Sequence, residues 1–86
     1  MELEQQICTF LCDKVLYIDD VFEYSNDSSF IEEGLIDSTG VMEIVGYVES
    51  AFGIAVDLHE VTPANFDSIN KIAAFIRSKR ALRAAG

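Results

Sequence analysis

The chain has 86 residues, of which 50% are apolar. This is enough for one small domain with a single core, and too little for a core plus a roomy active-site cavity. Its 15 acidic and 6 basic residues give a net charge of −9 at pH 7, which repels nucleic acid phosphates and anionic lipid. We therefore expect a protein that binds neither nucleic acid nor membrane. We expect it to be a monomer with one domain over residues 1–86, which ends in a basic tail at about 79–86.

The N-terminus carries acidic residues at positions 2 and 4, where a secretory signal needs positive charge. No apolar run approaches the ~20 residues of a membrane span, so we expect a cytoplasmic protein. Cys8 and Cys12 are the only cysteines and His59 is the only histidine. Two cysteines without further thiols or a nearby histidine predict neither a disulfide framework nor a zinc site. No metal site is expected.

The first predicted element is a helix over about residues 2–16. Its apolar side chains recur at helical spacing: Leu3, Ile7, Phe10, Leu11, Val15 and Ile18. From Asp19 to Gly34 this pattern gives way to Asp, Asn, Ser and Glu, with a few scattered apolar residues: Val21, Phe22, Phe30 and Ile31. Loops longer than about 12–15 residues are usually functional or disordered. We interpret the four apolar residues as anchors of a long, ordered loop.

The second predicted helix has the clearest apolar stripe and runs from Val41 to Phe52. Its stripe follows the i, i+3, i+4, i+7 and i+11 spacing of one helix face: Val41, Ile44, Val45, Val48 and Phe52. Gly46 lies inside this helix at a cost of up to about 1 kcal/mol relative to alanine. Gly53 follows at the position where a glycine ends a helix.

After an extended stretch at 54–58, Thr62 and Pro63 predict an N-cap and a first helical residue for a short helix that ends near Phe66. Either Asp67 or Ser68 is expected to cap a last helix, which has an apolar stripe and a basic end at 77–83. Three longer helices and one short helix predict an all-α fold. We expect a small antiparallel four-helix bundle with a long loop between helices 1 and 2.

Ser38 stands where the polar loop meets the second helix, and it is the candidate functional residue. A helix start collects unpaired N–H groups and the positive end of the helix dipole, which suit a phosphate better than a bare nucleophile. A nucleophilic serine needs a general base within hydrogen-bond reach, and His59 is the only histidine in the chain. We therefore interpret Ser38 as an attachment point, and we expect no catalytic residues.

A resemblance to a known family covers essentially the whole chain. The stretches that carry it are the Gly34-Leu35-Ile36-Asp37-Ser38 lead-in, the helix with Glu43 and Glu49, the Phe52–Val56 exit and the Thr62–Ile69 segment. Together they look like the acyl, aminoacyl and peptidyl carrier protein family, and the Asp-Ser pair is the most specific part. In that family the serine is esterified by 4′-phosphopantetheine from coenzyme A, whose terminal thiol carries acyl or aminoacyl groups as thioesters. The resemblance implies that Ser38 is the attachment site and Asp37 its motif neighbour.

The same resemblance implies partner enzymes: a phosphopantetheinyl transferase, an acyl- or aminoacyl-loading ligase, and a downstream synthase or transferase. Residues on the second helix outside the core stripe are candidates for docking them: Thr39, Met42, Glu43, Gly46, Tyr47 and Glu49. Acidic residues there would steer basic enzyme surfaces. The alternative is that these charges form only a solvated face, but their position next to Ser38 favours docking.

Asp67-Ser68-Ile69 is a second Asp-Ser-apolar tripeptide at a helix start. Ser68 lacks the Gly-Leu-Ile lead-in and precedes a basic helix, so a helix cap explains it better. Thr39 and Gly40 differ from the aliphatic and acidic residues of common fatty acid carriers. They favour a stand-alone carrier of a specialised pathway over one of housekeeping fatty acid synthesis, which stays the alternative pathway that the resemblance allows.

A second interpretation is an acidic helical adaptor of the same fold that binds proteins without a prosthetic group. Such an adaptor needs no serine after Asp37, so the Asp37-Ser38 junction discriminates between the two hypotheses.

Overall fold

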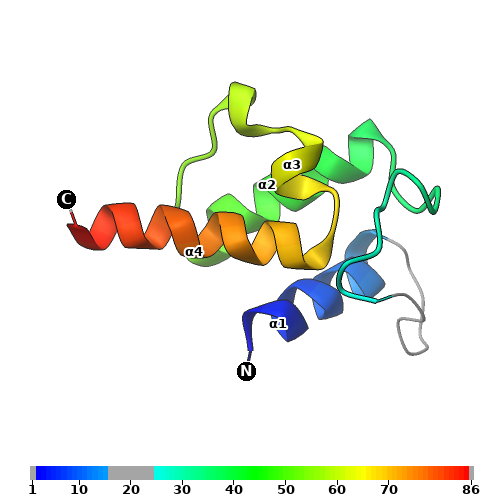
Figure 1. Ribbon diagram of the computed structural model, residues 1–86, viewed down its shortest axis with the longest axis horizontal. Helices are drawn as coiled ribbons and strands as arrows, with labels where there is room; N and C mark the ends of the chain where they lie inside the picture. Colours follow the sequence, from blue (N-terminus) through cyan, green and yellow to red (C-terminus); the bar gives the residue numbers. More distant parts are fainter. Residues whose placement is uncertain (1, 16–24, 86) are drawn as a thin grey trace.

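The computed structural model describes residues 2–15 and 25–85, and every regular element in these ranges is helical (Figure 1). In chain order the elements are α1 (Leu3–Phe10), a π turn η1 (Leu11–Val15), α2 (Ser38–Phe52), a 3₁₀ turn η2 (Leu58–Glu60), α3 (Pro63–Phe66) and α4 (Ile69–Ala85). The predicted all-α bundle of three longer helices and one short helix is confirmed. Within the same ranges, no helix combines the length and the apolar character that crossing a membrane requires.

The helix boundaries differ from the predicted ones at three ends. The first helix widens into η1 for its last five residues, and position 16 lies outside the described ranges. Helix α2 starts at Ser38 rather than Val41, because Asp37 caps it. Helix α4 continues to Ala85, so the segment predicted as a basic tail is helical through that residue.

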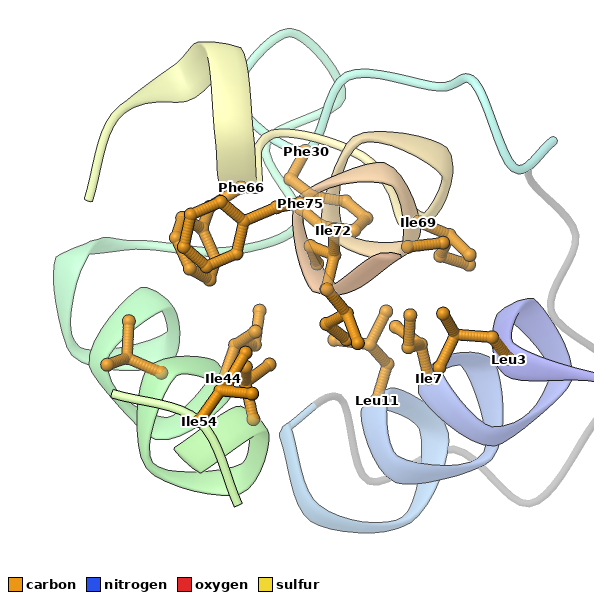
Figure 2. Packing of buried hydrophobic residues seen from close by; sticks show 14 residues of the cluster. Leu3, Ile7, Leu11, Phe30, Ile44, Ile54, Phe66, Ile69, Ile72 and Phe75 are labelled. Atoms are coloured by element: carbon orange, nitrogen blue, oxygen red, sulfur yellow. The ribbon is translucent and has the colours of Figure 1, made fainter. Parts of the chain in front are cut away.

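The core lies where α1, α2 and α4 meet, and the loop, α3 and the α2 exit close it (Figure 2). Each long helix buries most of its apolar stripe, as periodicity predicts. Four predicted stripe residues are only partly buried and pack against the core: Phe10, Val15, Val41 and Phe52. The buried apolar residues are Leu3, Ile7 and Leu11; Ile44, Val45 and Val48; Ile69, Ile72, Ala73, Phe75 and Ile76; and Phe30, Ile54 and Phe66. The rings of Phe66 and Phe75 pack with their centroids 5.2 Å apart. This contact joins α3 to α4.

The described part of the long loop, from residue 25 onward, packs against the α3–α4 junction (Figure 1). Phe30 is 2% exposed and is a core anchor as predicted. The same prediction for Ile31 is wrong, because its side chain is 61% exposed. The other two expected anchors, Val21 and Phe22, lie outside the described residues.

Three basic side chains near the end of α4 make contacts within the molecule: Arg77, Lys79 and Arg80. Arg77 forms a two-point ion pair with Glu4 of α1, with N–O distances of 2.7 and 2.9 Å. This hydrogen-bonded pair lowers the pKa of Glu4 and raises that of Arg77. Lys79 contacts Glu60 at 2.9 Å. The guanidinium of Arg80 lies 4.9 Å from the ring centroid of Phe52. These contacts connect the end of α4 to α1, η2 and α2.

Cys8 and Cys12 are free thiols on one side of the α1–η1 helix. Partial burial raises the pKa of Cys8, and the neighbouring Cys12 raises it further through its charge and a hydrogen bond. A raised thiol pKa means less thiolate and lower reactivity at neutral pH. In the part of the chain that the structure describes, no three His, Cys, Asp or Glu side chains converge on a possible metal position.

Candidate functional site

The start of α2 is built by a turn, a left-handed glycine and an aspartate cap. The N–H of Leu35 donates to the carbonyl of Phe30 at 2.9 Å, and Gly34 ends this turn with a φ of 66°, a conformation that glycine adopts without a side-chain clash. Asp37 then caps α2: its Oδ1 accepts the N–H of Gly40 at 2.9 Å. Its carbonyl accepts the N–H of Val41 at 3.0 Å. The cap makes Ser38 the first helical residue.

The side chain of Ser38 is exposed. Its hydroxyl has no hydrogen-bond partner in residues 2–15 and 25–85, so no described histidine or carboxylate activates it as a nucleophile. The N–H groups of Ser38 and Thr39 likewise have no acceptor in these ranges, and they stand at the positive end of the α2 dipole. An exposed hydroxyl beside open N–H groups fits the phosphodiester of an attached arm.

Gly40 allows the lead-in to lie close against α2. A Cβ atom at this position would be 2.6 Å from Cγ2 of Ile36 and 3.4 Å from Cγ1 of Val15. Contacts under about 3 Å do not occur between carbon atoms, so only glycine fits without displacement of Ile36. Gly40 is therefore required for the close approach of the lead-in, of η1 and of the first turn of α2.

An apolar hollow of about 250 Å³ opens beside Ser38. Its lining comes from the loop, the first turns of α2, and the segment from η2 to the start of α4: Phe30, Ile31, Ile36, Ser38, Val41, Met42, Val61, Thr62, Pro63, Phe66 and Asp67. The exposed side chains of Ile31 and Met42, at 61% and 52%, belong to this lining. An apolar group attached near Ser38 therefore has a surface on which to pack.

The predicted docking residues lie on different sides of α2. Thr39 and Glu43 are exposed and line a more polar recess toward η1, together with Asp37. Met42 lines the apolar hollow on the other side. Gly46 and Glu49 are exposed farther along the helix.

Tyr47 is the least accessible of the predicted docking residues. Its ring stacks on Phe10 of α1 with centroids 4.0 Å apart, and its hydroxyl donates to the carbonyl of Gln6 at 3.4 Å. Partial burial raises the pKa of Tyr47. The residue joins α1 to α2, and its role in docking remains a prediction.

Ser68, the rival serine, is 2% exposed. Its Oγ accepts the N–H of Lys71 at 3.1 Å, which makes it the cap of α4. A hydroxyl that is buried and engaged in this way cannot receive an arm without disruption of the helix start. Of the two Asp-Ser pairs that stand at helix starts, only the one at α2 presents its serine to solvent.

Comparison with known families shows the family to which the chain belongs. The sequence pattern of the phosphopantetheine attachment site family matches residues 5–76. The chain belongs to this family.

Several curated relatives of this carrier protein are named D-alanyl carrier protein. The relative from Abiotrophia defectiva is 30% identical over 77 residues, which cover 90% of this chain and 95% of the relative. The one from Bacillus velezensis is 31% identical, with 84% and 90% covered, and the one from Bacillus pumilus is 32% identical, with 85% and 91% covered. The similarity therefore spans nearly the whole of each protein.

Family membership determines several general properties. The chain is a carrier protein with a covalently attached 4′-phosphopantetheine, and it is not itself an enzyme. Its partners include a phosphopantetheinyl transferase and the ligase and transferase enzymes that handle the carried group. The adaptor without a prosthetic group is not favoured.

Proposed function

We propose that Ser38 is the attachment site and that the carried group is a small aminoacyl group, held as a thioester and presented to partner enzymes of a specialised pathway. The observation that carries the attachment site is the exposed, unengaged hydroxyl of Ser38 on the first turn of α2. When bound, the 4′-phosphopantetheine arm supplies the thiol that forms the thioester. The chain supplies the oxygen at Ser38, the open N–H groups and the neighbouring hollow.

The attachment site is tested by incubation of the apo protein with coenzyme A and a phosphopantetheinyl transferase, followed by intact-mass measurement. We expect wild type and Ser68→Ala to gain one phosphopantetheine each, and Ser38→Ala to gain none. Peptide sequencing should place the modification on Ser38. A full gain in Ser38→Ala, or no gain in wild type, rejects the assignment.

Two observations support a small cargo. The relatives that we compared are named for D-alanine, and the hollow of about 250 Å³ lies at or below the low end of the ~300–1,000 Å³ range of ligand pockets. We therefore propose a D-alanine-type aminoacyl group as cargo.

The apolar lining of the hollow favours a second candidate, a short acyl chain. The experiment is to load the holo protein with adenylating ligases of each kind and to compare the loading rates for D-alanine, L-alanine and a short fatty acid. Preferential loading with D-alanine supports the first candidate. Preferential loading with the fatty acid, with altered NMR shifts of the Val41 and Met42 methyl groups on loading, supports the second.

A further inference from the structure

Asp67 lies between α3 and α4 and receives hydrogen bonds from three consecutive residues of the long loop. Its carbonyl accepts the N–H of Phe30 at 2.8 Å. Its Oδ1 accepts the N–H of Ile31 at 3.0 Å, and its Oδ2 accepts the hydroxyl of Ser29. Asp67 is only 9% exposed. Charge-assisted bonds to a shielded carboxylate are strong, so they hold this part of the loop in place.

The carboxylate of Asp67 is not needed to start α4. Ser68 already caps that helix through the N–H of Lys71. Both carboxylate oxygens of Asp67 instead bond to the loop. Because a buried charge is costly unless it is hydrogen-bonded, these loop contacts are what compensates for the burial of Asp67.

The loop segment held by Asp67, residues 29–34, is itself an internally bonded turn, which we call the clamped turn. The N–H of Glu32 donates to Oγ of Ser29 at 3.1 Å, and that of Glu33 donates to the carbonyl of Ser29 at 3.0 Å. Gly34 ends this turn four residues before Ser38. The position of the clamped turn therefore determines the path of the chain into α2.

The clamped turn also forms one wall of the apolar hollow. Phe30 and Ile31 line it from the loop side, and Asp67 lines it beside them. Ser38 and Met42 line it from α2. The width of the hollow therefore depends on the bonds between Asp67 and the loop.

We propose that Asp67 is a positioning residue of this carrier protein: through the clamped turn it fixes both the lead-in to Ser38 and the wall of the hollow beside it. The proposal rests on the proposed attachment at Ser38. Asp67 acts through the loop, without contact to the serine hydroxyl. Loss of the bonds between Asp67 and the clamped turn lets the lead-in adopt other conformations. Only a fraction of the molecules then presents an ordered Ser38 to the transferase.

The first test measures the kinetics of phosphopantetheine transfer to Asp67→Ala, with Ser68→Ala as the matched control. Ser68→Ala weakens the same helix start and leaves the bonds of Asp67 in place. For Asp67→Ala we expect KM for the apo protein to rise about tenfold, with kcat within about twofold of wild type. Ser68→Ala should change neither. Asp67→Asn keeps an acceptor for the Ile31 N–H and should restore most of the loss.

The second test does not depend on attachment. Amide hydrogen exchange of the apo protein should show about tenfold faster exchange at Phe30 and Ile31 in Asp67→Ala than in wild type, and no such change in Ser68→Ala. Unchanged exchange at both amides overturns the clamp. Faster exchange with unchanged KM shows that Asp67 only stabilises the loop and overturns its positioning role.

A milder variant keeps the proposal testable if Asp67→Ala does not fold. Ser29→Ala removes one of the three bonds to Asp67, together with the acceptor of the Glu32 N–H within the clamped turn. It should raise KM by a smaller factor and speed exchange at the same amides. No change in either quantity overturns the proposal. If the wild type itself is not modified at Ser38, the proposed attachment site is wrong, and the predicted effect of Asp67 on transfer is rejected with it. Exchange still decides separately whether the clamp exists.

Discussion

The same dipeptide, Asp-Ser, stands at the start of two helices and is used in opposite ways. At α2, Asp37 caps the helix through the N–H of Gly40, and Ser38 becomes an exposed first helical residue. At α4, Ser68 caps the helix and is buried, while Asp67 holds the long loop. A shift of one residue in the helix start decides whether the serine side chain faces solvent or accepts a backbone N–H as the helix cap.

The residues that precede each pair explain the shift. A turn ended by the left-handed Gly34 leads to Asp37, and the chain there stays at the surface. Buried Phe66 leads directly to Asp67, which draws the second pair into the interior. A buried serine and aspartate must find partners, and the helix start and the loop provide them. A serine at a helix start is therefore a candidate for modification only when another residue supplies the cap.

The third helical residue also distinguishes the two starts, and it gives the largest expected change in stability. Gly40 at α2 has no room for a Cβ atom, whereas Lys71 at α4 is exposed. We expect Gly40→Ala to lower the free energy of unfolding by about 1–3 kcal/mol through overpacking against Ile36. Lys71→Ala should stay within about 0.5 kcal/mol of wild type. Urea unfolding followed by circular dichroism measures both.

Gly46→Ala is the second control for this prediction, because it changes a glycine in the same helix. A Cβ atom there meets nothing within 4 Å. Alanine should therefore raise the free energy of unfolding by about 0.5–1 kcal/mol, through its helix propensity alone. If Gly40→Ala raised the free energy of unfolding as Gly46→Ala does, the close contact of Ile36 with position 40 would be contradicted.

A smaller loss of stability is expected when the capping residue of either helix is removed, and that residue is the aspartate at α2 but the serine at α4. Asp37→Ala at α2 and Ser68→Ala at α4 should each lower the free energy of unfolding by about 1 kcal/mol, because each leaves an N–H without its acceptor. Ser38→Ala should change it by less than about 0.5 kcal/mol. Thermal and urea unfolding of the apo proteins measure these differences. An equal loss in Ser38→Ala and Asp37→Ala would contradict the assignment of the α2 cap.

The smallest expected change in stability comes from an ion pair that lies away from both helix starts. It shows how much a surface charge alone contributes, for comparison with the substitutions at the helix starts. Arg77 holds the pKa of Glu4 below its ordinary value of 4.5. A lowered pKa in the folded state contributes stability above pH 4.5, which is lost as the pH falls through the folded pKa. Glu4→Gln should therefore be slightly less stable than wild type at pH 7 and equally stable in strong acid. The pair lies at the surface, with 56% of the Arg77 side chain and 20% of the Glu4 side chain exposed, so the difference is small.

Urea unfolding at a series of pH values measures this difference. Glu32→Gln is the matched control, because the Glu32 carboxylate makes no ion pair in the described part of the chain. A deficit of Glu4→Gln that persisted unchanged in acid would show that the packing of the side chain, and not its charge, is responsible.

Local patterns predicted the helices, because apolar spacing located them. The position of Ser38 at a helix start, together with the family resemblance, made it the candidate site, and helix capping explained Ser68. The sequence left the cap of α4 open between Asp67 and Ser68, because both side chains can accept from a helix N–H. The bonds that decide between them come from Ser29 and Ile31, which lie 38 and 36 positions away.

Several of the features that were missed depend on how segments of the chain pack against one another. Ile31 was predicted to be an anchor, yet it is exposed, because apolar character alone does not show which of two adjacent loop residues points inward. The hollow gathers residues from several segments, so no single stretch indicates it. The requirement for glycine at position 40 arises partly from Val15, which lies on η1. Packing of this kind is fixed only when the helices have docked.

Glu49 illustrates how one side chain can complicate a mutational study of recognition. Its Oε2 accepts the N–H of Val56 at 3.1 Å, so it fastens the segment that leaves α2. Charge reversal at Glu49 removes this backbone bond together with a surface charge, and reduced enzyme affinity would then have two explanations. Glu43 is exposed, and its carboxylate makes no ion pair in the described ranges. Reversal at Glu43 isolates the electrostatic contribution, and it is the position with which to begin mapping the enzymes that this protein meets.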